Sequence, residues 1–369
     1  MDFRLTEEQA MLRDTLSRYL AEADPLDARL KRRGTAPRGD AILWRALAVD
    51  LGIVGAALPE AAGGLGGGAV ETMIVMEALG EALATTPYLS TVVLCANILQ
   101  RAGDTRLLPG IADGSAQIAL AALEADSRHA WHAVETRATR DADTWRLRGE
   151  KGVVLGAPDA QWLLVSARTA GEPRDREGVS LFLVAAEDVT RHDYRLIDAS
   201  PAADVVLDGA PARPIGAIGE AVPWLEQAGD AATAALCAEA AGLARRMLAD
   251  TIEWTKQRRQ FGQPLAAFQV LQHRMVDMYM AAEQIQSAAY LATLNLDADA
   301  ATRARAVSAA KAVTADALRF VAQNAVQLHG AMGMTDELAV GHYFKRATAI
   351  EQQFGGADHH LARYGRLAA

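Results

Sequence analysis

The sequence predicts an α+β protein with a helical N-terminal domain, a middle barrel or sandwich of antiparallel strands, and a C-terminal four-helix bundle. The chain has 369 residues, which corresponds to roughly two to three domains. Aromatic residues make up only 5% and alanine is abundant, which favours helix over an all-β fold. Strand-like runs are confined to the middle of the chain. We therefore expect domains at residues 1–114, 115–217 and 218–369.

The N-terminal domain shows helical spacing of apolar residues. Thr6 and Gln9 have the spacing of a capping box, in which each side chain accepts from the other residue's main-chain N–H. The glycine-rich stretch 58–68 is interpreted as a turn, because it lacks the Gly-Lys-Ser/Thr signature of a phosphate loop. Further helices are expected over residues 42–52, 70–85 and 88–102.

The middle domain is predicted from short apolar or alternating runs separated by Asp, Gly and Pro turns. The runs cover residues 116–123, 133–138, 144–148, 152–155, 162–167 and 179–184, and one or two more strands fall within 192–207. The C-terminal domain has long helical stretches joined by short turns, as in a four-helix bundle. These stretches cover residues 228–257, 268–296, 301–329 and 340–353.

Composition excludes several classes of function. A net charge of −9 argues against a nucleic-acid surface. No apolar run reaches the ~18 residues of a membrane span, and the N-terminus lacks the apolar core of a signal peptide, so we expect a cytoplasmic protein. Cys95 and Cys237 lie in apolar helical contexts and are predicted to be buried, reduced thiols. No Cys or His spacing indicates a metal site.

Two helix ends carry the residues most suited to a ligand. Arg258, Phe261 and Gly262 close one long helix, Gln269 follows, and Gln327 and Gly330 close another. A guanidinium, a phenyl ring and carboxamides at helix ends can hold a large anionic, aromatic cofactor. The alternative for any single residue is an ordinary helix end with a surface arginine.

In order and spacing, these motifs resemble those of the acyl-CoA dehydrogenase family. The C-terminal motifs are Arg258-x-x-Phe261-Gly262, Phe268-Gln269, Asp277-Met278 and Gln327-Leu328-His329-Gly330-x-x-Gly333, and the N-terminal ones are Leu58-Pro59-Glu60…Gly63-Gly64-Leu65-Gly66 and Glu77-Ala78-Leu79-Gly80. The resemblance covers the whole chain. It implies FAD bound between subunits, an acyl-CoA substrate, an electron-transfer flavoprotein as electron acceptor, and a tetramer.

The resemblance also implies roles for individual residues. Arg258 and Phe261 would hold the pyrophosphate and adenine half of FAD, and Gln269, Gln327 and the backbone near Gly330 would assist. Leu123 and Glu124 correspond to the Thr-Glu-Pro segment that lines the flavin ring, although the threonine hydroxyl is missing. The strand that covers the flavin in the family, Trp-Ile-Thr/Ser, is represented by Val153-Val154-Leu155.

The chain departs from the family at the catalytic base. The family's usual glutamate position falls on Phe354, or on Gly355 with a one-residue shift, and neither can take a proton. A second position used by some members falls on Ala232. Glu239, seven residues further along the same predicted helix, is the nearest carboxylate in a small, apolar run, where a charge needs a task or a partner. It is a candidate base; the alternative is an ion pair with Arg245, Arg246 or a neighbouring helix.

This pattern resembles the shorter, divergent subunits of heteromeric acyl-CoA dehydrogenases that act on dicarboxylyl-CoA or steroid side-chain CoA esters. We therefore expect an FAD-dependent subunit of fatty acid or steroid side-chain β-oxidation that converts an acyl-CoA to the 2-enoyl-CoA, in a homo- or hetero-tetramer. Two alternatives stay open. One is a catalytically incomplete partner that shares its flavin site, and the other is an oxygen-using flavin monooxygenase or oxidase on the same fold.

Overall fold

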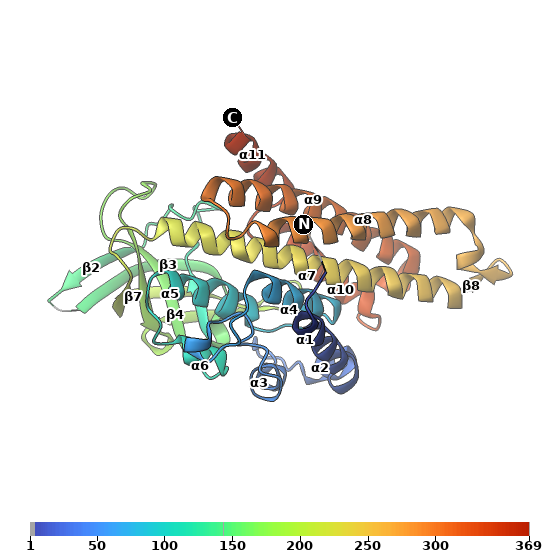
Figure 1. Ribbon diagram of the computed structural model, residues 1–369, viewed down its shortest axis with the longest axis horizontal. Coiled ribbons are helices and arrows are strands. Elements are labelled where there is room, and N and C mark those ends of the chain that lie inside the picture. The colour runs from blue at the N-terminus through green and yellow to red at the C-terminus, as the bar shows by residue number, and fades with distance from the viewer. Residues whose placement is uncertain (1–3, 143, 369) are drawn as a thin grey trace. The chain divides into compact units, whose positions relative to one another are not determined.

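The computed structural model describes residues 4–142 and 144–368, which form two compact units (Figure 1). The helical unit contains the chain up to residue 31, residues 69–84, and everything from 233 onward. The barrel unit contains residues 32–68 and 85–232. Helix α7 (Val222–Gln257) begins in the barrel unit and continues into the helical unit. The two units thus cut across the three expected domains, because the N-terminal helices are divided between them.

The helical unit confirms the long helices expected from the sequence. It contains α1 (Glu7–Arg18), the π-helical turn η1 (Tyr19–Ala23), α2 (Leu26–Arg32), α4 (Ala69–Glu81), most of α7, α8 (Gln269–Leu294), α9 (Ala300–His329), the 3-10 turn η8 (Gly330–Met334), α10 (Ala339–Gln352) and α11 (Ala357–Ala368). The capping box of α1 is present: Gln9 N donates to Thr6 Oγ1 (3.2 Å) and Thr6 N donates to Gln9 Oε1 (3.0 Å). Helix α11 lies beyond the last helix expected from the sequence.

Helices α4 and α7 cross with their backbones in contact. A Cβ added at Gly80 of α4 would overlap the carbonyl oxygen of Glu239 on α7, and one added at Gly242 of α7 would overlap the carbonyl oxygen of Glu77 on α4. Only glycine, which has no side chain, allows this approach. The crossing therefore fixes α4 against the middle of α7.

The barrel unit confirms the predicted β domain and surrounds it with short helices. The helices are α3 (Ala41–Arg45), η2 (Ala46–Asp50), η3 (Glu60–Ala62), η4 (Leu89–Ala96), α5 (Asn97–Arg101), α6 (Leu108–Ala112), η5 (Ala157–Asp159) and η6 (Ala186–Asp188). The strands are β1 (Ile118–Ala121), β2 (Arg137–Asp141), β3 (Thr144–Leu155), β4 (Trp162–Arg168), β5 (Val179–Ala185), β6 (Thr190–Arg195) and β7 (Pro201–Ile215). Cys95 here and Cys237 of α7 are buried free thiols, as predicted.

The strands run in the order β1-β4-β2-β3-β7-β5, and the additional β4–β5 pairing closes the path from β4 to β5 into a barrel. Strand β6 pairs with the outside of this path at β7. Most pairs are antiparallel, as expected, but β1 pairs with β4 in parallel, and β2 touches β4 in parallel at one residue pair. The two runs predicted at 144–148 and 152–155 are one strand, β3, whose pairing with β7 shifts between Lys151 and Val154.

A long turn joins α7 and α8 at the far end of the helical unit. It contains the two-residue strands β8 (Arg259–Gln260) and β9 (Gln263–Pro264) and the 3-10 turn η7 (Leu265–Ala267). Within the described residues, no helix combines the length and apolarity that crossing a membrane requires. The same residues contain no group of three or more His, Cys, Asp or Glu side chains arranged for a metal ion.

The helix crossing makes a first prediction. Gly242→Ala should destabilise the chain by about 3 kcal/mol, because the new methyl group meets the main chain of α4, which cannot move aside. Gly365→Ala in α11 is the matched control: an added Cβ there meets nothing within 4 Å, so alanine should be neutral or stabilise by about 0.5–1 kcal/mol. Urea denaturation followed by circular dichroism measures both. Equal stabilities of the two variants would contradict the close crossing.

Candidate functional site

The turn between α7 and α8 presents the predicted Arg258–Phe261 motif to solvent. Helix α7 ends at Gln257, and the N–H of Arg258 donates to the carbonyl of Trp254 (2.8 Å). Phe261 has φ +53° and is 89% exposed, and its ring touches the edge of the Phe268 ring at 6.2 Å between centroids. An aromatic ring this exposed, on a backbone that disfavours it, is ready to contact a ligand.

The second motif, Gln327 to Gly330, lies beside the first. The imidazole of His329 stacks on the indole of Trp254, one turn before Arg258, with centroids 5.1 Å apart and an interplanar angle of 23°. His329 is buried, its Nδ1 lies 2.8 Å from the carbonyl oxygen of Ala325, and burial lowers its pKa. The neutral imidazole therefore packs face to face on the Trp254 ring, and this contact joins the C-terminal ends of α7 and α9.

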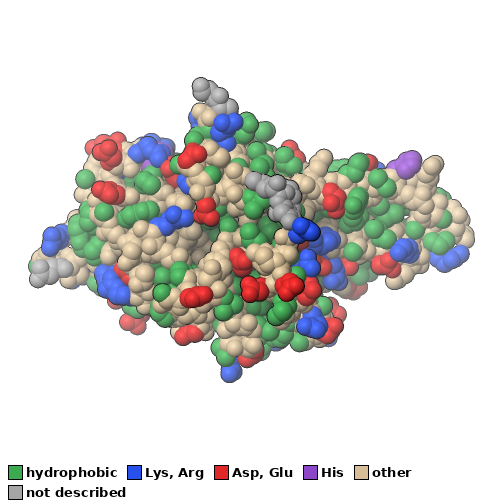
Figure 2. Space-filling view, viewed as in Figure 1, with side chains coloured by type: hydrophobic (Ala, Val, Ile, Leu, Met, Phe, Trp, Pro, Cys, Tyr) green, Lys and Arg blue, Asp and Glu red, His purple; other side chains and the backbone are tan. Residues whose placement is uncertain are grey.

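Gln269 completes this cluster as the first residue of α8. The residue before it, Phe268, caps the helix with its backbone and makes no side-chain capping bond, which leaves the helix start accessible to an external anion. Arg258, Gln269 and Gln327 are all exposed. A guanidinium, a helix N-terminus and an aromatic ring fit the pyrophosphate and adenine half of FAD. Several apolar side chains of α8 are exposed: Val270, Val276, Tyr279, Met280, Leu291 and Leu294. Figure 2 shows apolar side chains on the surface at its right-hand end, where Figure 1 places the α7–α8 turn.

The Leu123–Glu124 segment lies in the barrel unit and is built around a buried ion pair. Glu124 accepts from the N–H groups of Glu135 (2.6 Å) and Thr136 (3.0 Å) and from the ammonium of Lys151 (2.6 Å). Lys151 is fully buried and also donates to Ser166 Oγ (3.0 Å). Burial favours the neutral forms of both groups and lowers the pKa of Lys151 to about 8, but the Lys151 charge and the donated hydrogen bonds lower the pKa of Glu124.

Glu124 is therefore committed within its own chain. Its N–H donates to Ser127 Oγ (2.9 Å), and its carbonyl oxygen accepts from both the hydroxyl and the N–H of Ser127. Its side chain holds Lys151 and also lines the pocket described next, and its role in binding the cofactor stays a prediction. Leu123 accepts from the N–H of Gly152 (3.0 Å), which places it next to the bulged part of β3.

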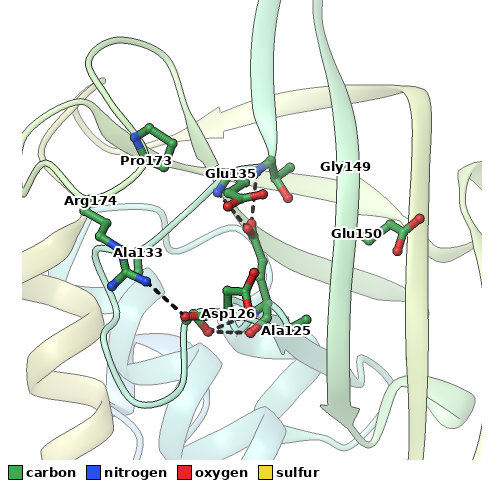
Figure 3. A pocket seen from close by; sticks show the side chains of 11 residues that line it. Ala125, Asp126, Ala133, Glu135, Gly149, Glu150, Pro173 and Arg174 are labelled. Atoms are coloured by element: carbon green, nitrogen blue, oxygen red, sulfur yellow. Dashed lines mark hydrogen bonds between the residues drawn. The ribbon is translucent and has the colours of Figure 1, made fainter.

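A pocket of about 370 Å³ opens beside this segment (Figure 3). Its walls include Ala125 and Asp126 on one side and the loop after β4 on the other, from which Arg174 reaches the carbonyl oxygen of Asp126 (3.5 Å). Glu135 and Glu150 also line it. The pocket has room for part of a ligand within the barrel unit.

Arg168, at the end of β4, fixes the wall of this pocket. It is fully buried and its guanidinium donates to six main-chain carbonyls, those of His132, Val134, Ala170, Pro173, Asp175 and Glu177. Burial lowers its pKa, with Asp175 opposing. Sequence reasoning missed this residue; the signal was an arginine at the end of the apolar run 162–167.

The candidate base Glu239 forms a two-pronged ion pair with Arg346 of α10. The Nε–Oε1 and Nη2–Oε2 distances are both 2.6 Å, and the side chains are 12% (Arg346) and 9% (Glu239) exposed. This is the predicted alternative of a partner on a neighbouring helix, rather than Arg245 or Arg246. Both carboxylate oxygens accept from one guanidinium, so Glu239 has the ion-pair partner of the alternative interpretation, and its role as a base stays a prediction.

The usual base position, Phe354 or Gly355, lies in the turn between α10 and α11. Lys311 of α9 is fully buried and donates to the carbonyls of Ile350 (2.8 Å), Glu351 (3.1 Å) and Gly355 (3.0 Å). Burial lowers its pKa to about 8. The carbonyl of Phe354 lies 3.1 Å from His360 Nε2, and Phe354 itself has φ +56°. The turn is held firmly but carries no proton acceptor. Lys311 was also missed, although it stands alone in the apolar run 309–313.

Three domain families match the sequence: acyl-CoA dehydrogenase N-terminal domain over residues 6–115, middle domain over 119–209 and C-terminal domain over 230–365. It is 31% identical over 393 residues to acyl-CoA dehydrogenase FadE27 of Mycobacterium tuberculosis, which covers 100% of this chain and 99% of that protein. The chain belongs to the acyl-CoA dehydrogenase family. Members of this family are FAD-dependent oxidoreductases that act on a CH–CH bond of an acyl-CoA, so the family and cofactor predicted from the motifs are confirmed.

Two solved structures are also similar to this acyl-CoA dehydrogenase chain. The ChsE4–ChsE5 complex from Mycobacterium tuberculosis is similar with a TM-score of 0.88 and 29% identity, over 99% of this chain and 98% of that one. A variant of the Tcur3481–Tcur3483 steroid ACAD is similar with a TM-score of 0.87 and 31% identity, over 98% of each chain. The predicted resemblance to the steroid-type, heteromeric branch of the family is confirmed by these two.

The Glu239–Arg346 pair makes a second prediction. Arg346→Gln should destabilise the chain by about 3–5 kcal/mol, because it leaves a buried carboxylate without its counter-ion. The double variant Glu239→Gln with Arg346→Gln should recover most of that loss. Lys256→Gln is the control, since its pair with Glu253 is 58% and 60% exposed and should be worth less than about 1 kcal/mol. A double variant no more stable than Arg346→Gln would contradict a specific pairing.

The Glu124–Lys151 pair makes a prediction about pH. Since the pKa of Glu124 in the folded chain lies below its ordinary value of 4.5, the stability it contributes is complete above that value and is lost as pH falls through the lowered pKa. Glu124→Gln should therefore be less stable by about 3 kcal/mol at pH 7, and its melting temperature should fall less between pH 5 and pH 3.5 than that of the unaltered chain. Glu150→Gln, an exposed neighbour, should leave the pH profile unchanged. Parallel profiles for Glu124→Gln and the unaltered chain would contradict the coupling.

Proposed function

We propose that this chain is the FAD-binding, base-lacking subunit of a heteromeric acyl-CoA dehydrogenase that introduces an α,β double bond into an acyl-CoA. The observation that supports this proposal is that none of the positions considered for a catalytic base has a free carboxylate. Residue 232 is alanine, the turn at Phe354–Gly355 has no proton acceptor, and both oxygens of Glu239 are bound to Arg346. In this proposal the proton of the acyl α-carbon leaves to a base that a partner subunit supplies.

The chain's own residues have defined tasks in this proposal. Arg258 pairs with the FAD pyrophosphate, the amides at the start of α8 bind the same anion, and Phe261 lies against the adenine. In the barrel unit, Leu123 and the adjoining end of β3 contact the flavin half of a cofactor that is shared between subunits. When bound, FAD accepts the hydride that leaves the acyl β-carbon. Gln269 and Gln327 add hydrogen bonds that orient the dinucleotide.

The exposure of the cofactor cluster supports a shared site. Arg258, Phe261, Gln269 and Gln327 are open to solvent on one chain, so a second chain is needed to enclose FAD. The similar ChsE4–ChsE5 structure is itself a complex, and the second similar structure is called a steroid ACAD. We therefore propose a partner from the same family, a bulky acyl-CoA such as a steroid side-chain ester as substrate, and an electron-transfer flavoprotein as electron acceptor.

An absorption spectrum tests the proposal directly. The chain is purified alone and after co-expression with its genomic neighbour, and each sample is titrated anaerobically with short, dicarboxylyl and steroid side-chain acyl-CoAs. We expect flavin bands that bleach only in the co-expressed complex. Bleaching by the chain alone would show that it contains its own base, and Glu239→Gln would then be the first variant to assay. Rapid reoxidation of the reduced flavin by oxygen would instead indicate an oxidase or monooxygenase.

The role of Arg258 can be tested by cofactor content. Arg258→Ala should weaken FAD binding by roughly 10- to 100-fold, because it removes charge-assisted hydrogen bonds to the pyrophosphate. FAD retained after gel filtration of the complex, measured by absorbance, checks this. Lys256→Ala, an exposed cation on the last turn of the same helix, is the matched control and should retain FAD. Full FAD occupancy in Arg258→Ala would remove Arg258 from the site.

A further inference from the structure

Strand β3 contains a bulge at Gly152 and Val153. Lys151 pairs with Val205 of β7 and Val154 pairs with Ala203, so the two residues between them face Asp204 alone. Val153 has φ +51°, a conformation that strains a β-branched residue. Bulges re-aim side chains, and they are frequent next to active sites. Here the bulge turns Val153 outward, and the valine is 52% exposed while Val154 is buried.

Asp204 holds this strained backbone in place. Its Oδ1 accepts from the N–H of Val153 (3.0 Å) and from the hydroxyl of Tyr194 on β6 (2.8 Å). Burial and the Asp204 charge raise the pKa of Tyr194 to about 12, so the hydroxyl keeps its proton and donates. Asp204 is itself exposed, so it takes no part in the barrel core.

The bulge is also tied to the segment predicted to contact the flavin. The N–H of Gly152 donates to the carbonyl of Leu123 (3.0 Å), and Lys151 holds Glu124. An exposed valine at positive φ destabilises the folded chain, and here hydrogen bonds hold it in that conformation. Such strain is found more often at a ligand-binding surface than at a surface without a ligand. Glycine would adopt the same backbone without strain.

We propose that Asp204, supported by Tyr194, is a positioning residue that holds the Val153 bulge against the flavin. This rests on the proposed function, because the ligand is FAD. The family resemblance implies that Val153 lies in the segment that covers the flavin, and its exposure and strained backbone support that role. Asp204 acts through the main chain of Val153. In this proposal the hydrogen bonds that Asp204 accepts from Val153 and Tyr194, and not its negative charge, hold the bulge in place.

The first experiment needs no cofactor. Thermal unfolding is measured for Asp204→Ala, Val153→Gly and the combined variant. Because glycine adopts positive φ without support, Asp204→Ala should lower the melting temperature clearly in the unaltered chain and by less than half as much in the Val153→Gly background. Equal losses in the two backgrounds would overturn the proposal, since they would mean that Asp204 does not support the strained residue.

The second experiment uses the FAD-loaded chain, with its partner where the partner is needed for loading. Asp204→Ala should weaken FAD binding at least 5-fold and shift the flavin absorption bands. Asp204→Asn, which keeps an acceptor oxygen, should stay within twofold of the unaltered protein, and Tyr194→Phe should be intermediate. Asp208→Ala is the matched control, because Asp208 is exposed on the same strand and pairs with Arg148. An Asp204→Ala variant with unchanged affinity and spectrum, or an Asp204→Asn variant as weak as it, would overturn the proposal. Failure of the unaltered complex to bind any FAD would instead overturn the proposed function, while the unfolding experiment still decides on the support of Val153.

Discussion

The backbone-to-backbone crossing of α4 and α7 is the constraint on which the helical unit depends. Gly80 and Gly242 remove the side chains that would separate the two helices, and the neighbouring charged residues are thereby brought into fixed positions. Arg245, less than one turn after Gly242, pairs with Glu77 of α4 (2.6 Å), and Glu239, one turn before Gly242, is aligned toward α10. Because the middle of the crossing has no room for side chains, the ion pairs of Arg245 and Glu239 form at its edges. The candidate base Glu239 lies at one of these edges, where it pairs with the guanidinium of Arg346.

Three of the buried cations hold irregular segments near the predicted site residues or the pocket. Lys151, Arg168 and Lys311 each lie in a regular element and donate to main-chain carbonyls of a loop or turn. A buried charge is costly unless hydrogen bonds replace its water, and a loop offers unpaired carbonyls that a helix or strand does not. The buried cation therefore obtains its hydrogen bonds from the loop, and the loop carbonyls obtain their donors from the cation. The segments held in this way are the Leu123–Glu124 segment, the wall of the pocket and the turn at Phe354–Gly355, so rigidity is concentrated where the sequence motifs place the site.

Local spacing was sufficient to predict most of the fold, and contacts between distant residues account for what it missed. Helical period and the Thr6–Gln9 spacing act within a few residues, and the structure confirms them. The single strand β3 was divided in two because Gly149, Glu150 and Lys151 separate its two apolar runs, although pairing with β7 continues through this stretch. Likewise, motif order was sufficient to predict the family and FAD. The Glu239–Arg346 pair joins residues 107 positions apart, and no local pattern encodes which arginine reaches the carboxylate.

Strained backbone occurs in several of the stretches that the family resemblance assigns to the site. Val153, Phe261 and Phe354 are bulky residues at positive φ, and each lies in a stretch that the family resemblance assigns to the flavin or to the base. Each such residue costs on the order of 1–3 kcal/mol and persists only where its surroundings hold it. At Phe354 the surroundings are Lys311 and His360, which bind the carbonyls on either side of a position that has no base. A chain reduced to a passive scaffold would gain stability by relaxing this turn. A firmly held turn without a proton acceptor is what the proposed subunit requires, because it shapes an active site and takes its base from a partner.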